Sequence, residues 1–523
     1  MPNSKSVFAY NKANFIDQLH LISGAQKNLL TDHKPHVDYF DGYLQDINAL
    51  TMIVEEQYID KDYLEDYTYY YVRSFPYYKK TCGRLHFFKT AIDEDEFDKF
   101  LKGKPSAVNA KILQNNYLGF MVVKPLPKTI IGKTCLTPYP EINRRYYQIM
   151  RGYNVNLFGV DLYVESLAYQ EQDGVVAACA SIAIWSSLHG TGALFQHATP
   201  SPVEITKTAT MYYPTASRHF PESHGLGPEQ IAQAIRKMSL EPFYVDGNTY
   251  ENIKSTAYAY LKCKIPIIFG FELHDPLLKK EEWFGRHAVT MTGYSLGLTK
   301  AKKFSGDGLL LTSSRIDKIY VHDDQVGAFA KMEFDEKIIK DSKKKNILHT
   351  LSSSFPNCIG QIDKVRAKPE ILIIPLYHKI RIPFKSILLI VEKFNNLITI
   401  VARTLGFPIP YIEWDIYLSI SSDFKSDIIE KNLIKGKKRE KILKMLLPKY
   451  VWRAIGKVND KETFEFLFDA TDLEQGKKIL LFIDYDSKFT KPVLGPIVKN
   501  LPPTAKNHPE FKPIWDAVIS ELS

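Results

Sequence analysis

The chain has 523 residues, which is too long for a single hydrophobic core, so several domains are expected. Its 45% hydrophobic and 24% charged residues, with 31 tyrosines and 30 phenylalanines, exclude an extensively disordered protein. The net charge of +9 is a small excess for this length and no nucleic-acid-binding motif accompanies it, so a solvated basic surface is favoured over nucleic-acid binding.

The cysteine pattern argues against a disulfide framework and against a structural zinc site, because no two cysteines form a C-x-x-C pair. The five are Cys82, Cys135, Cys179, Cys263 and Cys358. Free, scattered cysteines are typical of a reducing compartment. The first residues, MPNSKSVFAYNKANF, lack the apolar stretch of a signal peptide, and no run of about 18 apolar residues occurs. We therefore expect a cytoplasmic protein with no membrane span, no metal and no cofactor.

Residues 1–150 are expected to form an aromatic-rich α/β region. Residues 43–59 have the apolar spacing of a helix, whereas the tyrosine-rich residues 67–75 fit a helix or a strand equally well. Short apolar segments at 84–89 and 117–136, broken by turn residues, indicate strands.

Residues 151–335 alternate helices and strands most clearly and are expected to form a central domain. Helices are predicted over 177–189, 225–238 and 249–263. Pro228, in the first turn of the second of these, suits a helix N-terminus. Strands are predicted over 265–273, 286–296 and 318–323.

Residues 336–523 are expected to form a separate mixed α/β region that follows a solvated linker at 335–346. The apolar stretch from Ile371 to Val391 is interrupted by basic side chains, and it fits two buried strands or a strand and a helix. Residues 424–447 predict a basic amphipathic helix. Further strands are predicted over 449–458, 463–470 and 477–486.

The stretch EQDGVVAACASIAIW places Cys179 near the start of a predicted helix. A nucleophilic cysteine needs a stabilised thiolate, a base within hydrogen-bond reach, a group that orients the base, and donors for the oxyanion. The sequence offers each part. Gln172 lies upstream, His287 opens the strand HAVTMTGY, and Asp323 ends the strand IYVHD.

These motifs, in the order Q-D…C-A…W, GLGPEQI, PIIFGFEL, HAVTMTGY and YVHDDQVG, resemble the papain-like cysteine peptidase superfamily. Within it they are most similar to the leader-processing (double-glycine leader) peptidases attached to bacterial bacteriocin exporters, over about residues 160–330. The resemblance implies an α+β fold in which a helix that bears the nucleophile packs on an antiparallel sheet. It also implies that Cys179 is the nucleophile, His287 the base, Asp323 the orienting acid and Gln172 the oxyanion donor.

Two departures from the family pattern leave alternatives open. Gln172 lies further upstream of the cysteine than the glutamine of the family, and Gln170 is the weaker candidate. Asp324 stands where the family often has a proline, so Asp323 and Asp324 both remain candidates. The spacing from Asp323 to Gly327 favours Asp323. His322 alternates to the other side of the strand and is not expected to be catalytic.

The resulting expectation is a cytoplasmic, bacterial cysteine peptidase that acts on a protein or peptide substrate. The outer regions would supply substrate selection or regulation, and a regulatory partner protein is a further expectation. The same triad also serves acyl transfer to an amine, as in transglutaminases, or deamidation of a protein glutamine. The third alternative is a catalytically silent binding protein that keeps the papain-like scaffold.

Overall fold

A computed structural model describes most of the chain, in two compact units. The described residues are 6–140, 144–211, 225–274, 283–303, 308–334, 339–340, 347–348, 350–353, 365–406, 411–471, 478–509 and 512–522. Cys358 and most of the predicted linker lie outside them. No helix in the described part of the chain is both long enough and apolar enough to cross a bilayer.

The two units are interleaved along the chain. Unit 1 consists of Met1–Tyr250, Lys264–Ser295 and Asp317–Pro375. Unit 2 consists of Glu251–Cys263, Leu296–Ile316 and Leu376–Ser523. The chain therefore leaves and re-enters unit 1 twice before it ends in unit 2. The predicted division into three domains stays a prediction.

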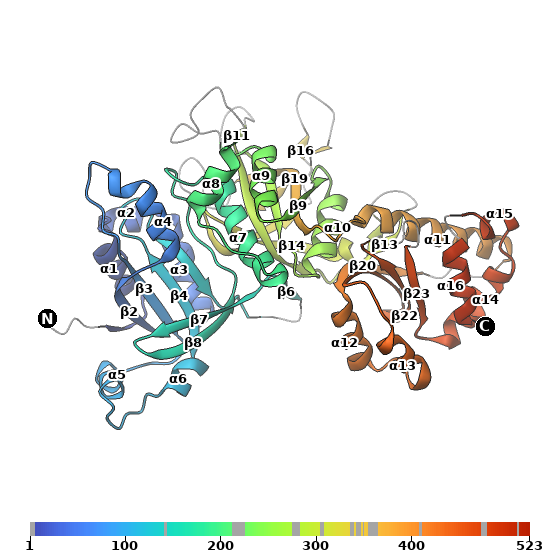
Figure 1. The fold of residues 1–523 in the computed structure, drawn as a ribbon, viewed down its shortest axis with the longest axis horizontal. Coiled ribbons are helices and arrows are strands. Elements are labelled where there is room, and N and C mark those ends of the chain that lie inside the picture. The colour runs from blue at the N-terminus through green and yellow to red at the C-terminus, as the bar shows by residue number, and fades with distance from the viewer. Residues whose placement is uncertain are drawn as a thin grey trace. The chain divides into compact units, whose positions relative to one another are not determined.

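The first sheet of unit 1 is antiparallel with strand order β1-β2-β3-β4-β5 (Figure 1, blue). Its strands are β1 (Val7–Ala9), β2 (Thr51–Tyr58), β3 (Cys82–Phe88), β4 (Tyr117–Val123) and β5 (Ile131–Leu136). The helices in this region are α1 (Lys12–Ser23), α2 (Lys27–Asp32), α3 (Pro35–Asp46), α4 (Lys61–Tyr69), α5 (Glu94–Leu101) and α6 (Ala110–Asn115). The strands predicted at 84–89 and 117–136 are confirmed.

The helix predicted over 43–59 is wrong in its second half. Helix α3 ends at Asp46, and residues 51–58 form the second strand of the sheet. Four consecutive residues, 51–54, are buried there, as in a strand covered on both faces, and such an apolar run has no periodicity of its own. Residues 67–75 contain the end of α4 and a 3-10 turn, Tyr71–Arg73, and no strand.

The second sheet of unit 1 follows the order β10-β11-β14-β15-β18-β19-β9, and β6 pairs with β11. An additional antiparallel pairing of β10 with β19 joins the six strands from β10 to β19 into a ring. The strands are β6 (Arg145–Tyr147), β9 (Leu240–Asp246), β10 (Ile267–His274), β11 (Trp283–Leu296), β14 (Ile316–Asp323), β15 (Gly327–Phe334), β18 (Leu351–Ser353) and β19 (Arg366–Tyr377). All three strands predicted in the central domain are confirmed.

The central helix α7 (Cys179–Phe195) packs against this sheet. It is buried on all sides from Ala180 to Gly192, and its small residues let neighbouring elements approach closely. Two hydrogen bonds attach it: Thr290 Oγ1 donates to the Ala183 carbonyl at 2.6 Å, and Ser186 Oγ donates to the Ala168 carbonyl at 2.9 Å. The other elements here are the hairpin β7 (Arg151–Leu157) and β8 (Val160–Ser166), and the helices α8 (Pro202–Thr210) and α9 (Pro228–Lys237). Helix α10 (Tyr250–Leu261) belongs to unit 2 from Glu251 on. The three predicted helices are confirmed.

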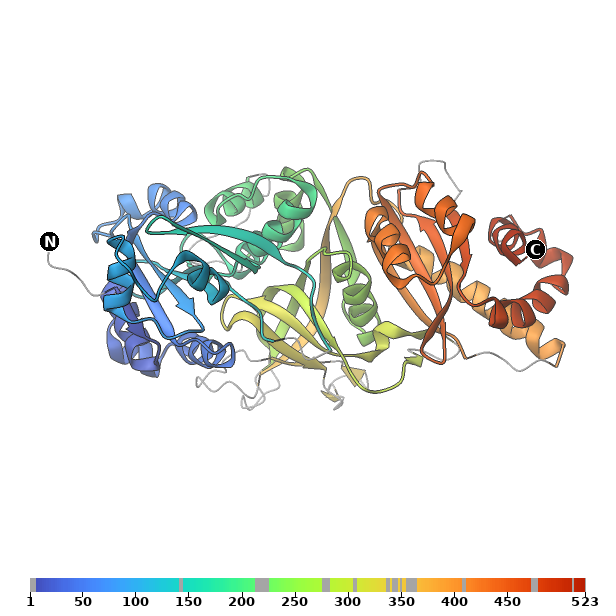
Figure 2. The ribbon, with the colours of Figure 1, turned by 90° about the horizontal axis from the view of Figure 1, so that it is seen from below.

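Unit 2 is built on a sheet of order β12-β13-β20-β21-β22-β23 (Figure 2, mostly orange to red). Its core is aromatic, and the rings of Phe394, Trp414 and Phe466 contact one another. The strands are β12 (Lys302–Lys303), β13 (Leu310–Leu311), β20 (Glu413–Ile420), β21 (Tyr450–Val458), β22 (Lys461–Asp469) and β23 (Ile479–Asp484). The helices are α11 (Phe384–Thr404), α12 (Ser421–Lys431), α13 (Gly436–Lys444), α14 (Ser487–Lys499), α15 (Pro503–Lys506) and α16 (Lys512–Leu522).

The single basic helix predicted over 424–447 is wrong, because the chain breaks it into α12 and α13. Asn432 ends α12 with φ 51°, and Gly436 has φ 64°; both lie in the left-handed region that interrupts a helix. The stretch from Ile371 to Val391 is a strand followed by a helix, the second of the two predicted alternatives. The described part of the chain is thus mixed α and β, and its sheets are antiparallel apart from the parallel pairing of β13 with β20, in keeping with the α+β prediction.

Candidate active site

Cys179 is the first residue of α7, at the end of the helix where backbone N–H groups are exposed. Ala178 occupies the N-cap position with φ −94° and ψ 172°, and it supplies no side-chain hydrogen bond. Because alanine cannot cap the helix, it stabilises the helix by about 1 kcal/mol less than a capping residue would. Packing, and not a cap, therefore determines where α7 starts. The N–H groups and their partial positive charge lie beside the cysteine, an environment that stabilises a thiolate.

The loop before the cysteine is anchored on both sides of Gln172. The Glu171 backbone N–H donates to the Ile131 carbonyl at 3.1 Å, and Glu171 Oε2 accepts from the Ile131 N–H at 3.2 Å. The Asp173 carboxylate accepts a hydrogen bond from the Tyr71 hydroxyl at 2.6 Å. Gln172 is half-buried between these two fixed neighbours, and no hydrogen bond of its side chain is found among the described residues.

A tight turn then brings the chain to the nucleophile. Gly174 has φ +71°, a conformation that favours glycine, and its N–H donates to the Ala177 carbonyl at 3.0 Å. Asp173 Oδ1 also accepts from the Val175 N–H at 3.1 Å. The chain therefore bends at Gly174, and this bend links the anchored loop directly to Cys179.

His287 and Asp323 come together from two neighbouring strands. His287 lies on β11 opposite Phe271 of β10, and Asp323 is the last residue of β14. His287 Nε2 lies 2.8 Å from Asp323 Oδ1. The Cys179 side chain lies close enough to the same imidazole to help raise the pKa of His287. Because Asp323 occupies Nε2, the nitrogen left for the thiol is Nδ1. The structure thus brings together three of the four predicted site residues, Cys179, His287 and Asp323.

The acidic partners of His287 favour its charged form. Burial opposes a charge on the imidazole, but the carboxyl groups of Asp323 and Asp324 outweigh it and raise the pKa of His287 well above 6.5. His287 is 5% exposed and Asp323 1%, so water screens their attraction little. The site therefore favours the imidazolium form of His287.

Asp324 is the more distant of the two acids. Its Oδ1 lies 3.7 Å from His287 Nε2, against 2.8 Å for Asp323. Burial is the main cause that raises the pKa of Asp324 to about 7; His287 opposes this rise and Asp323 adds to it. Gln325 contacts both acids: its N–H donates to Asp323 Oδ1 at 3.0 Å, and its side-chain amide donates to Asp324 Oδ2 at 3.2 Å.

The N-terminal region holds this acidic turn, a role that the sequence did not reveal. The imidazole Nε2 of His36, on α3, lies 2.9 Å from the Asp324 carbonyl oxygen. The Tyr169 hydroxyl donates to the same oxygen at 3.4 Å. Both are buried. No local pattern signals a contact between His36 and Asp324, because 288 residues separate them.

Gly327 lets α3 approach the same turn. The Tyr39 hydroxyl donates to the Ala328 carbonyl at 2.6 Å. A Cβ atom on Gly327 would lie 2.1 Å from Tyr39 Cδ1, closer than real atoms come. The glycine that marks the motif YVHDDQVG thus has a packing role here. It makes room for the helix that supports the acidic turn.

His322 and the described cysteines other than Cys179 lie in environments that suit a structural role. His322 Nδ1 lies 3.0 Å from Ser186 Oγ on α7, and burial lowers the pKa of His322 to about 3, so it stays neutral. Cys82 and Cys135 are buried, and burial raises the pKa of both thiols. Cys263 is buried too, whereas Cys179 is partly exposed.

His287, Asp323 and Asp324 are also the one group of described residues with metal-ligand spacing, since a ligand atom from each lies within 4.8 Å of the others. A His with two carboxylates is a reasonable partial ligand set for a divalent cation. However, His287 Nε2 already has a hydrogen bond to Asp323, and the raised pKa of His287 favours a proton over a metal ion at this nitrogen.

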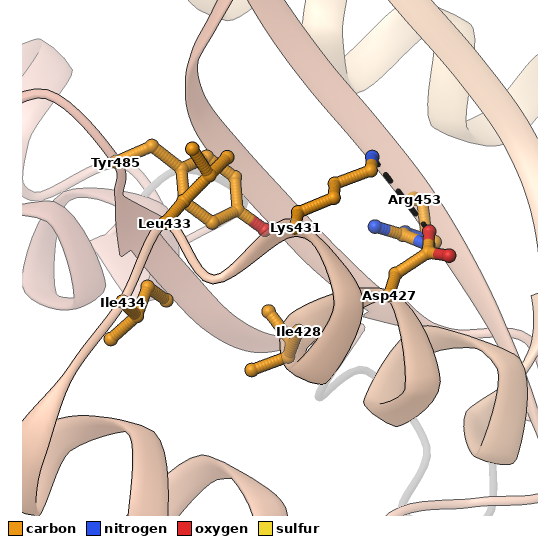
Figure 3. A pocket seen from close by; sticks show the side chains of 7 residues that line it. All are labelled: Asp427, Ile428, Lys431, Leu433, Ile434, Arg453 and Tyr485. Atoms are coloured by element: carbon orange, nitrogen blue, oxygen red, sulfur yellow. Dashed lines mark hydrogen bonds and ion pairs between the residues drawn. The ribbon is translucent and has the colours of Figure 1, made fainter.

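A hollow in unit 2 is filled by its own ion pairs (Figure 3). Arg453 pairs with Asp427 at its edge and with Glu465 beneath it, and Lys431 lies 3.8 Å from Asp427. The remaining lining residues are Ile428, Leu433, Ile434 and Tyr485. The arginine is 1% exposed, so this cluster belongs to the packing of unit 2. None of the predicted site residues lies in it.

Searches of protein-family models and of curated proteins find no match to this chain.

Proposed function

We propose that this protein is a cysteine-dependent hydrolase, and specifically a peptidase with a Cys179–His287–Asp323 triad. The observation that carries the proposal is the grouping of the Cys179 thiol next to the His287 imidazole, which in turn is hydrogen-bonded to Asp323. The three residues come from the start of α7 and from the strands β11 and β14. Such a grouping, with a nucleophile, a base and an orienting acid, is what nucleophilic acyl chemistry requires.

In the proposed reaction the Cys179 thiolate attacks the carbonyl carbon of a peptide bond. The developing oxyanion is stabilised by the Cys179 backbone N–H, and by the Gln172 side-chain amide once substrate is bound. The imidazolium of His287 gives its proton to the departing amine, and a thioester remains. His287 then removes a proton from water, which attacks the thioester and releases the acid product. Asp323 holds the imidazole in place throughout.

The arrangement of the unit 1 fold supports the papain-like assignment. The nucleophile starts a buried helix, and that helix packs on an antiparallel sheet that carries the base and the acid on adjacent strands. The base precedes the acid in the chain, as the resemblance implies. The partner expected from this reaction is a protein or peptide substrate.

The proposal is tested with wild-type protein and a Cys179→Ala variant, each incubated with a whole proteome whose products are then compared by mass spectrometry. New chain termini are expected with wild-type protein only. Cys82→Ala is the matched control, because that thiol is buried and burial raises its pKa, and the variant should cleave like wild type. Cleavage that persists in Cys179→Ala would refute the nucleophile assignment.

The same spectra separate the alternatives that use the same triad. Cross-linked products would indicate acyl transfer to an amine, and conversion of glutamine to glutamate would indicate deamidation. Iodoacetamide labelling adds an independent test that needs no substrate. Cys179 should react fast at pH 6 and slowly in His287→Ala. If neither cleavage nor fast labelling occurs, a binding protein on this scaffold is the better description.

A further inference from the structure

A tyrosine-rich cleft lies in unit 1 beside the loop that leads to Cys179. It measures about 670 Å³, within the usual range for ligand sites. Its lining residues are Tyr69, Tyr70, Tyr71, Arg73, Ser74, Phe75, Pro76, Tyr78 and Val175. All but Val175 come from one short segment that follows α4 or ends it. This segment lies outside residues 160–330, the part of the chain that resembles the papain-like family.

The cleft exposes large aromatic side chains to solvent, which is unfavourable unless a ligand covers them. Phe75 is 104% exposed, Tyr69 48% and Tyr70 42%, and Tyr77 beside them is 87% exposed. A contiguous group of exposed aromatic rings marks an interaction site. Tyrosine rings also bind at low entropic cost, because each has few rotatable bonds.

The cleft and the catalytic cysteine share one loop. The Tyr71 hydroxyl of the cleft wall donates to Asp173 at 2.6 Å, and Asp173 accepts from the N–H of Val175, which lines the cleft. Val175 precedes Cys179 by four residues, so even a fully extended chain keeps them within about 14 Å. A peptide of a few residues therefore spans from the cleft to the thiol.

The exposed charge of the cleft is positive. Arg73 is exposed and is the one charged residue among those that line it in the described part of the chain. Lys207 Nζ lies 4.8 Å from the centre of the Tyr69 ring. Two carboxylates near Tyr71, Asp66 and Asp173, are buried, at 4% and 8% exposure. Positive charge at the rim favours acidic groups in the ligand.

We infer that this cleft is a substrate-recognition site for a peptide segment that carries a large apolar side chain flanked by acidic residues. The apolar side chain packs among Tyr69, Tyr70 and Phe75, and the acidic neighbours pair with Arg73 and Lys207. The segment is part of the polypeptide whose scissile bond reaches Cys179, so the inference rests on the proposed peptidase function. The cleft would select substrates by a feature adjacent to the cleaved bond.

The test measures binding to the full-length Cys179→Ala protein, which removes turnover from the result. The probes are four pools of short fluorescein-labelled peptides, with Phe or Ala at the centre and either acidic or basic flanks. By fluorescence polarisation, the acidic Phe pool should bind about tenfold more tightly than each of the others. Equal affinity for all four pools, or no binding of any, would overturn the inference.

Variants then locate the binding. Tyr70→Ala and Phe75→Ala, each made in the Cys179→Ala protein, should weaken binding of the acidic Phe pool about tenfold. Tyr163→Ala is the matched control, because Tyr163 is 43% exposed on β8, outside the cleft. Arg73→Glu should reverse the preference between acidic and basic flanks, whereas Lys111→Glu, on α6, should not. Affinities unchanged by the cleft variants would refute the site.

The two proposals fail separately. If the wild-type protein cleaves a proteome but the cleft variants bind like their controls, the recognition site is wrong and the peptidase assignment stands. If the cleft binds as expected but wild-type protein gives no products that depend on Cys179, the peptidase assignment is wrong and the cleft remains a peptide-binding site.

Discussion

At the scale of single residues, the site depends on one imidazole that is placed among three partners. His287 is buried, yet its pKa is raised, because Asp323 and Asp324 outweigh the cost of burial. A group in such a position favours a proton on the nitrogen that faces Asp323. In the proposed mechanism, the positive charge of the doubly protonated imidazole stabilises the Cys179 thiolate at Nδ1, so the reactivity of Cys179 should report the charge on His287.

The first prediction concerns Asp323→Asn. Removing the carboxylate removes the largest favourable interaction of the imidazolium, so the pKa of His287 should fall. His287 then loses its proton at a lower pH, so the thiolate–imidazolium pair is lost at a lower pH as well. Iodoacetamide labelling of Cys179 at pH 6 should slow about tenfold, the effect of one pKa unit. Asp317→Asn, an acid of unit 1 that pairs with Arg144, is the control and should label like wild type. Equal rates in both variants would contradict the role of Asp323.

The second prediction separates Asp324 from Asp323 by pH. Because the pKa of Asp324 is about 7, its carboxyl is largely neutral at pH 6 and largely charged at pH 8. In Asp324→Asn, Cys179 should therefore be labelled as fast as in wild type at pH 6. At pH 8 it should be labelled several-fold more slowly, because the variant lacks the negative charge that Asp324 carries in wild type. A large effect at pH 6 would show that Asp324, and not Asp323, is the orienting acid.

At the scale of elements, the acidic turn between β14 and β15 is supported by α3 from the N-terminal region. His36 lies next to the Asp324 carbonyl, and Tyr39 packs on Gly327 and donates to Ala328. The helix thus fixes the direction in which Asp323 points. The helix acts by positioning the turn, because His36 and Tyr39 each contact a backbone carbonyl of the turn.

This support predicts the effect of Gly327→Ala. The added Cβ would meet the Tyr39 ring at 2.1 Å, so the ring or the turn must shift. Overpacking of this kind costs about 1–3 kcal/mol in the free energy of unfolding and should slow labelling of Cys179 by iodoacetamide. The double variant Gly327→Ala with Tyr39→Ala frees the space and should regain most of the labelling rate. Failure of the second substitution to restore the rate would show that the ring is not the obstacle.

Sequence patterns predicted the elements that carry the site better than the contacts that hold it. Cys179 and Asp323 sit at element ends that local periodicity and turn residues mark, whereas His287 lies inside β11, which begins at Trp283 and not at the predicted start. His36 was missed because a contact across the chain leaves no periodic pattern. The strand over 51–58 was misread because a strand buried on both faces shows no alternation. The helix break at Asn432 was missed because a left-handed asparagine resembles any polar residue in a helix.

At the scale of the whole molecule, the predicted catalytic residues all lie in unit 1, and unit 2 has an ionic cluster of its own. Arg453 is 1% exposed, and it pairs with Glu465 and Asp427. Its guanidinium lies between the rings of Tyr417 and Phe424, at 5.3 and 5.2 Å from their centres. Such a cluster stabilises only while all members are present, because Glu465 is fully buried.

Arg453→Met is therefore predicted to lower the free energy of unfolding of unit 2 by about 3–5 kcal/mol, the cost of an unpaired buried charge. Urea unfolding followed by tryptophan fluorescence measures this, since unit 2 contains Trp414, Trp452 and Trp515. The control is Lys444→Met, which breaks an exposed pair with Glu440 on α13 and should cost less than about 1 kcal/mol. Similar losses in both variants would contradict the account.

The interleaving of the two units has a consequence for the protein during its synthesis. Cys179 emerges from the ribosome long before His287 and Asp323, and two segments of unit 2 are made in between. Until residue 287 has been translated the thiol lacks its proposed base, and until residue 323 it lacks the acid that orients this base. Under the proposed mechanism, a nascent chain therefore gains a complete triad only after the acidic turn that packs against α3 has been made.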